Sequence, residues 1–141
     1  MKKLKKIISI LLIFSCGLVM SQEEFWPHEI KKEDKIITIY QPENETYINH
    51  RLKSKAAFSI KNNKSSTPIF GMMWTNALLD GDRDSKMANL VSIKVEEVRF
   101  PETVKESEQL KFKTLIETEV PKWNIEISMD DLVNSLQEVS A

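Results

Sequence analysis

Residues 51–61, RLKSKAAFSIK, carry the clearest hydropathy pattern in the chain and indicate its fold class. Small or apolar side chains recur at every second position, and mainly basic side chains lie between them. This alternation is typical of an antiparallel strand with one buried and one solvated face. The predicted buried side holds Leu52, Ser54, Ala56, Phe58 and Ile60, and the predicted solvated side holds Arg51, Lys53, Lys55, Ser59 and Lys61, with Ala57 as its one apolar member.

Three other segments have strand character. Residues 36–40 (IITIY) are β-branched and aromatic, and residues 87–100 resume an alternating pattern after a turn at 80–85. Residues 68–79 (PIFGMMWTNALL) are apolar on both faces, which indicates the central strand of a sheet. Residues 43–49 are polar and are predicted to form a loop.

Two positions predict irregularities inside these strands. Gly71 interrupts an apolar run, and a glycine there allows a bulge or the close approach of another group. Between residues 87 and 100 the alternation reaches Val98 and Phe100 only if Glu96 and Glu97 hold a bulge, because one extra residue reverses the phase.

The hydrophobic period changes after Pro101. Apolar residues from Phe112 to Val120 follow an i, i+3, i+4 rhythm, which predicts an amphipathic helix over 102–119. Residues 123–127 alternate again as a short strand, and Ser128 with Asp131 resembles a capping box that begins a terminal helix. The predicted fold is α+β: a mainly antiparallel sheet of four to five strands, with one long amphipathic helix and a short C-terminal helix packed on one face.

The first 21 residues have the features of a signal peptide. Four lysines at positions 2–6 precede an apolar run of 14 residues at 7–20, which is shorter than the roughly 20 residues of a membrane span. We therefore expect a signal peptide at 1–21, an N-terminal arm at 22–35 and a single α+β domain at 36–141. The mature chain is predicted to be exported, to the periplasm or beyond, and to have no transmembrane span.

The one cysteine, Cys16, supports a second interpretation of this segment. Residues 13–16 (IFSC) resemble a degenerate lipobox, in which Cys16 would carry a lipid and anchor the protein. Phe14 is bulky for that motif and the apolar run continues to Met20, which favours soluble export. In that case the mature chain contains no cysteine, and its stability comes from a packed core.

Export makes this chain of 141 residues more acidic than its formal net charge of -1. Removing the four signal-peptide lysines from 20 basic residues leaves 16 against 21 acidic residues, a net charge of -5. Nucleic-acid binding requires a clustered positive surface, so nucleic acid is not expected as a partner.

Residues with catalytic or metal-binding chemistry are sparse. The two histidines, His28 and His50, fit no metal-ligand or triad spacing, and no nucleophile elbow, Walker loop or dinucleotide fingerprint is present. The turn DGDRD at 80–84 begins like a calcium loop but lacks the glycine and glutamate that complete one. We therefore expect no enzymatic activity, no metal and no cofactor.

The tryptophans and the basic strand face are the candidate binding residues. Trp26 lies in the unpatterned arm, where its ring can stack on a sugar or pack onto the sheet, whereas Trp74 and Trp123 lie in apolar segments and are predicted to be core residues. The basic side of residues 51–61 is either a site for an anionic glycan or lipid headgroup, or a plain solvated face. The predicted ligand-binding residues are Trp26, Arg51, Lys53 and Lys55.

A series of short motifs runs in order over residues 26–136. They are Trp26-Pro27 to Ile30, Ile39-Tyr40-Gln41-Pro42, Ala56-Ala57, Pro68-Ile69-Phe70-Gly71 with Trp74, Asp82-Arg83, Arg99-Phe100-Pro101, and Val120-Pro121-Lys122-Trp123 continuing to Ile127-Ser128-Met129. Together they resemble a family of exported bacterial proteins labelled carbohydrate-binding family V/XII-like. The resemblance implies a non-catalytic binding module with an envelope or extracellular glycan as ligand. The alternative is a structural or assembly partner of another protein in the bacterial envelope.

Overall fold

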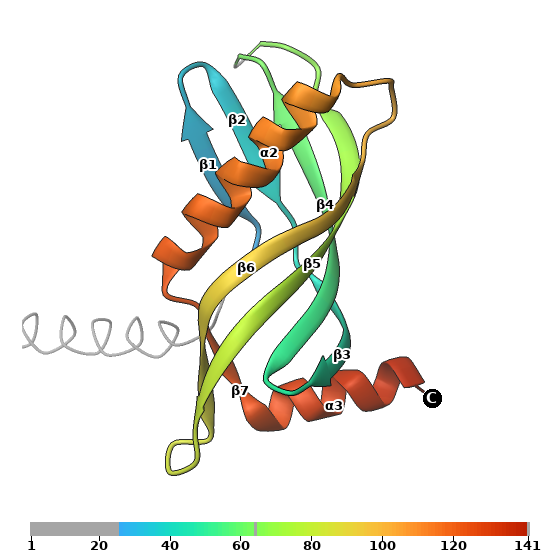
Figure 1. Ribbon diagram of the computed structural model, residues 1–141. Coiled ribbons are helices and arrows are strands. Elements are labelled where there is room, and N and C mark those ends of the chain that lie inside the picture. The colour runs from blue at the N-terminus through green and yellow to red at the C-terminus, as the bar shows by residue number, and fades with distance from the viewer. Residues whose placement is uncertain (1–25, 64, 141) are drawn as a thin grey trace, which may run out of the picture.

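A curled, seven-stranded antiparallel sheet is the main element of the structure (Figure 1). The computed structural model describes residues 26–63 and 65–140, with side chains up to Leu136. The predicted signal peptide, Cys16 and the first residues of the predicted arm lie outside this range. The strands are β1 (His28–Lys32), β2 (Lys35–Ile39), β3 (Glu43–Ile48), β4 (Arg51–Lys61), β5 (Ile69–Asp82), β6 (Met87–Arg99) and β7 (Glu126–Ser128).

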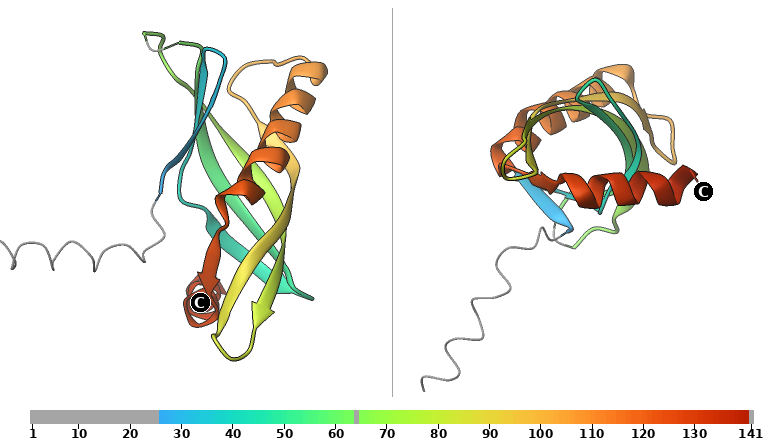
Figure 2. Two further views of the ribbon diagram at one scale, coloured as in Figure 1. Left: turned by 90° about the vertical axis from the view of Figure 1, so that its left-hand side faces the viewer. Right: turned by 90° about the horizontal axis from the view of Figure 1, so that it is seen from below.

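The three longest strands form the centre of this sheet. Its order is β1-β2-β4-β5-β6-β7, and β3 pairs with the first half of β4 while β2 pairs with the second half. Strand β4 alternates in the predicted register, with Leu52, Ala56 and Phe58 buried and Arg51 and Lys53 exposed. The prediction that Ser59 is solvated was wrong, because Ser59 is buried and its Oγ lies 3.5 Å from Tyr40 Oη. The sheet curls into a half-barrel, and the view along its axis in Figure 2 shows the strands around a common interior.

The predicted number of strands was wrong. Two further strands, β1 and β3, lie in segments expected to be an arm and a polar loop. Both have polar sequences, HEIKK and ENETYI, and Ile30 is the one buried residue that they contain. Short strands at the margins of a sheet bury little side chain and therefore show no clear alternation.

The prediction of one long helix was also wrong. Two short helices of similar length lie on either side of β7 in the chain: α2 (Glu106–Glu119, 14 residues) and α3 (Met129–Ser140, 12 residues). Helix α2 begins four residues later than expected, because the backbone is still extended at Lys105. A short 3-10 helix, η2 (Val120–Trp123), connects α2 to the segment that leads into β7. The predicted start of α3 is confirmed, since the Asp131 amide donates to Ser128 Oγ at 3.3 Å.

Two apolar clusters form the core on the concave side of the sheet. In the larger one, Phe112 and Ile116 of α2 pack against Phe58 of β4 and Val95 of β6. In the smaller one, Leu132 of α3 packs against apolar residues of β4, β5 and β6, namely Leu52, Ala77, Leu79 and Ala88. Each helix thus covers a different end of the half-barrel (Figures 1 and 2).

Both predicted irregularities are confirmed. The β5–β6 register shifts between Trp74 and Thr75, which leaves Glu96 as the extra residue of a bulge. A Cβ atom added at Gly71 would lie 2.5 Å from Phe58 Cζ and 2.5 Å from the Arg99 carbonyl oxygen. Glycine at this position therefore allows the close packing of β5 against the central phenylalanine of the core.

Candidate functional site

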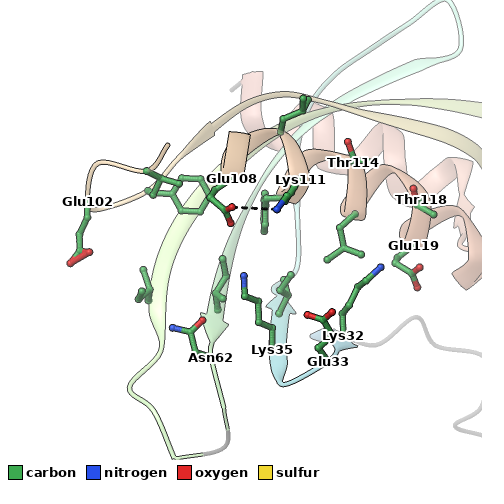
Figure 3. A pocket seen from close by; sticks show the side chains of 18 of the residues that line it. Lys32, Glu33, Lys35, Asn62, Glu102, Glu108, Lys111, Thr114, Thr118 and Glu119 are labelled. Carbon is green, nitrogen blue, oxygen red and sulfur yellow. Dashed lines mark ion pairs between the residues drawn. The ribbon is translucent and has the colours of Figure 1, made fainter. Parts of the chain in front are cut away.

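An open cleft of about 740 Å³ lies between α2 and the β1–β2 hairpin (Figure 3). Helix α2 packs on β6, on the opposite side of the half-barrel from β1 and β2, so the two walls of the cleft come from separate parts of the chain. The cleft volume falls within the range of about 300–1,000 Å³ that is usual for small-molecule sites.

The floor and one wall of the cleft are apolar. Strands β2, β4 and β5 contribute isoleucines, and the wall is formed by α2 and by the segment that leads into it. These residues are Ile37, Ile60, Ile69, Phe100, Val104, Leu110, Phe112 and Leu115. Two of them remain notably accessible, because Leu110 is 64% exposed and Ile69 is 36% exposed. The cleft therefore presents apolar surface that the fold leaves uncovered.

Charged side chains of both signs form the rim. Lysines and glutamates come from the β1–β2 hairpin, from α2 and from the segment that precedes α2. Figure 3 shows the hairpin residues on one side of the opening and the α2 residues on the other. They are Lys32, Lys35 and Lys111, and Glu33, Glu102, Glu108 and Glu119. Lys111 Nζ lies 3.6 Å from Glu108 Oε2, so part of this charge is neutralised within the rim. The site combines an apolar interior with nearly balanced charge at its mouth.

Trp26 does not line this cleft and lies instead in an aromatic cluster with His28 and Trp123. Its ring packs edge-on against Trp123 at 6.3 Å and against His28 at 4.5 Å between ring centroids. His28 stacks on Trp123 at 4.3 Å, and both tryptophans pack against the larger core cluster. Trp26 is thus tied to the fold, as in the alternative considered for it, and it also lines a second open hollow of about 690 Å³.

Beside this second hollow, a chain of hydrogen bonds joins three elements. Ser54 Oγ of β4 donates to Asn44 Oδ1 of β3 at 3.1 Å, and Asn44 Nδ2 donates to Ser135 Oγ of α3 at 3.0 Å. Ser135 Oγ in turn donates to the Leu132 carbonyl oxygen at 2.8 Å. These polar groups satisfy one another, so their evident role is to hold α3 against the sheet.

Arg51, Lys53 and Lys55 lie on the convex face of the sheet, opposite to the side that carries Trp26. The structure therefore does not bring the four predicted binding residues together. Trp74 lies on the convex face beside Lys55, with the Arg99 guanidinium carbon 4.9 Å from its ring centroid. The prediction that Trp74 is a core residue was wrong, because Trp74 belongs to neither core cluster and is only partly buried.

No sequence motif marks the cleft. Its lining comes from residues 32–37, from Ile60, Asn62 and Ile69, and from residues 100–119, which share no motif. One signal was present: Leu110 lies outside the apolar stripe that runs from Phe112 to Val120. An apolar residue beside such a stripe indicates a second, less covered side of the helix.

No family model, curated protein or solved structure matches this chain. Its resemblance to the V/XII-like family stays a prediction.

Two further findings concern the described residues. They contain no group of three or more His, Cys, Asp and Glu side chains placed to hold a metal ion. Over residues 26–63 and 65–140, no helix has both the length and the apolar character needed to cross a bilayer.

Proposed function

We propose that the mature chain is an exported, non-catalytic binding protein that holds a small amphiphile in the cleft between α2 and the β1–β2 hairpin. The observation that carries this proposal is the uncovered apolar floor and wall, on which Leu110 is 64% exposed. Each ligand methylene buried there contributes about 0.8 kcal/mol, so a short alkyl chain is sufficient for measurable affinity.

The rim favours a ligand whose polar end is zwitterionic or uncharged. A purely anionic headgroup would interact favourably with Lys32, Lys35 and Lys111 but would also approach four glutamates. A purely cationic headgroup meets the reverse problem. A headgroup carrying both signs, or only hydroxyl groups, avoids this repulsion.

The test is displacement of a neutral fluorescent probe, N-phenyl-1-naphthylamine, from the mature chain. We expect a lysophosphatidylcholine and an alkyl glycoside below their micelle concentrations to displace the probe more effectively than a fatty acid of equal chain length. Leu110→Glu places a charge on the apolar wall and should weaken probe binding about tenfold or more. Ser107→Glu is the matched control, since Ser107 is exposed on the same helix and does not line the cleft.

Equal probe binding by Leu110→Glu and Ser107→Glu would contradict the proposal that the ligand binds in the cleft. Trp26, Trp74 and Trp123 all lie outside the cleft lining, so tryptophan fluorescence reports on other sites. A tryptophan response to cell-wall polysaccharides, without probe binding, would favour the glycan ligand. Absence of both responses would favour the role of an assembly partner.

A further inference from the structure

Strand β1 has a free outer edge. It is the terminal strand of the sheet order, and among the described residues it pairs with β2 alone. Figure 1 shows it at the margin of the half-barrel. An edge strand presents unpaired main-chain N–H and C=O groups, to which a further strand can bond.

Glu29 and Lys31 direct their main-chain groups toward this free edge. The amide of Tyr40, which directly follows β2, donates to the Ala57 carbonyl oxygen at 3.0 Å. Even-numbered residues of β2 therefore bond to β4, and odd-numbered residues bond to β1. The register assigns the latter bonds to the even-numbered residues of β1. The main-chain groups of Glu29 and Lys31 thus have no hydrogen-bond partner within residues 26–63 and 65–140.

The side chains of the same two residues are exposed and carry opposite charges. Glu29 and Lys31 lie on the convex face, and neither forms an ion pair within the described part of the chain. Between them, Ile30 is buried in the larger core cluster on the concave side. In an antiparallel copy of this segment, the order of the two charges is reversed.

We propose that β1 pairs with β1 of a second copy of this chain, in an antiparallel, two-fold symmetric dimer centred on Ile30. In this register Glu29 lies opposite Lys31 of the second copy, and Lys31 lies opposite Glu29. Each of these pairs exchanges both main-chain hydrogen bonds, and cross-strand pairs of opposite charge stabilise a sheet. The two seven-stranded sheets are thereby joined along their edges.

The charges favour this register over its neighbours. Main-chain bonding requires one outward-directed residue opposite another, so the register shifts in steps of two residues. A step in one direction places Glu29 opposite Glu29 of the second copy, and a step in the other places Lys31 opposite Lys31. Like charges directly opposite each other destabilise a sheet. The charges that protect a short edge from other strands therefore leave a copy of the same strand as a fitting partner.

Dimer formation does not depend on the proposed function, because neither Glu29 nor Lys31 lines the cleft. Failure of probe binding in the cleft would leave the dimer unaffected, and the reverse also holds. The paired segment has five residues in each copy, so we expect a weak dimer that forms in concentrated solution.

The test is sedimentation velocity of the mature chain, beginning at Gln22, from about 5 to about 500 µM. We expect a dimer to form within this range. Glu29→Lys and Lys31→Glu should each weaken dimer formation about tenfold or more, since each variant places like charges opposite each other at both positions. An equimolar mixture of the two variants should restore the dimer, because every opposed pair again joins an acid to a base.

Asp84→Lys and Lys105→Glu are the matched controls. They change the net charge by the same amounts, and both residues are exposed and lie outside β1. Neither control should alter dimer formation. Hydrogen exchange locates the contact, since the amides of Glu29 and Lys31 should exchange more slowly as the protein concentration rises.

A chain that stays monomeric over the whole concentration range would overturn the proposal. So would a dimer that persists in both charge-reversal variants, because it would use another surface. Failure of the mixed variants to associate would show that the opposed charges do not pair, and would overturn the assigned register and the proposal with it.

Discussion

The two faces of the β4–β5 pair have similar backbones but different surroundings. On the concave face, Phe58 and Met73 are 0% and 3% exposed beneath helix α2. On the convex face, Trp74 and Phe70 are equally apolar but remain partly or largely exposed. An apolar pattern on both faces of a strand therefore does not show whether another element covers each face.

Charge is nearly balanced on both sides of the fold. The cleft on the concave side has a rim of three lysines and four glutamates. The strand registers place seven basic and seven acidic side chains on the convex face. The two faces therefore differ in the burial of their apolar residues and not in the sign of their charge.

The largest expected effect is that of Phe58→Asp. Phe58 is fully buried and contacts the rings of Phe100 and Phe112, so an aspartate there leaves an unpaired charge in the core at a cost of several kcal/mol. We expect loss of the cooperative unfolding transition measured by circular dichroism. Lys55→Asp, on the opposite face of β4, should change the free energy of unfolding by less than about 1 kcal/mol. Equal tolerance of both would contradict the register of β4.

Gly71→Ala should lower the free energy of unfolding by about 3 kcal/mol. The added methyl group would lie 2.5 Å from both Phe58 Cζ and the Arg99 carbonyl oxygen, and the backbone atom cannot move away without shifting β6. Urea denaturation provides the measurement. Gly81→Ala is the control in the same strand, since its methyl group would meet only the Ala88 Cβ atom at 4.0 Å. If the two variants are equally stable, the close packing at Gly71 is absent.

Trp26→Ala should destabilise the protein more than Trp74→Ala, by about 2 kcal/mol against about 1 kcal/mol. Trp26 packs against Trp123 and the larger core cluster, whereas Trp74 packs on the convex face beneath Arg99. Thermal unfolding of the two variants gives the comparison. The opposite order would show that Trp74 on the convex face is more deeply buried than the aromatic cluster around Trp26.

The smallest of these effects is expected for Asn44→Ala, at about 1 kcal/mol. Its amide group accepts from Ser54 of β4 and donates to Ser135 of α3, so its removal breaks one hydrogen bond within the sheet and one between the sheet and α3. Thr46→Ala, on the outward side of the same strand, should change stability by less than about 0.5 kcal/mol. Hydrogen exchange of α3 amides should increase only in Asn44→Ala. Unchanged exchange there would mean that apolar packing alone holds the helix.

Local hydropathy patterns predicted the elements that have one buried and one solvent-exposed side. The alternation of 51–61 set the register of β4, the phase change at Glu96 located a bulge, and Ser128 with Asp131 marked the start of α3. These features depend on neighbouring residues only. Strands β1 and β3 were missed because their hydrogen bonds to β2 and β4 form without burying a patterned set of side chains.

The amino-acid sequence by itself determined an antiparallel sheet with a solvated basic strand face, followed by helices. The reason is that side chains alternate between the two faces of a strand and recur every 3.6 residues on one face of a helix, so the spacing of apolar residues indicates the element. Tertiary structure alone decided the curl of the sheet, the side on which α2 packs and the separation of Trp26 from Arg51, Lys53 and Lys55. The cleft likewise exists only after residues 32–37, 60–69 and 100–119 meet. The physical reason is that α2 covers only one face and one end of the half-barrel. Which apolar residues it covers depends on how distant parts of the chain pack together, and local sequence patterns do not specify this packing.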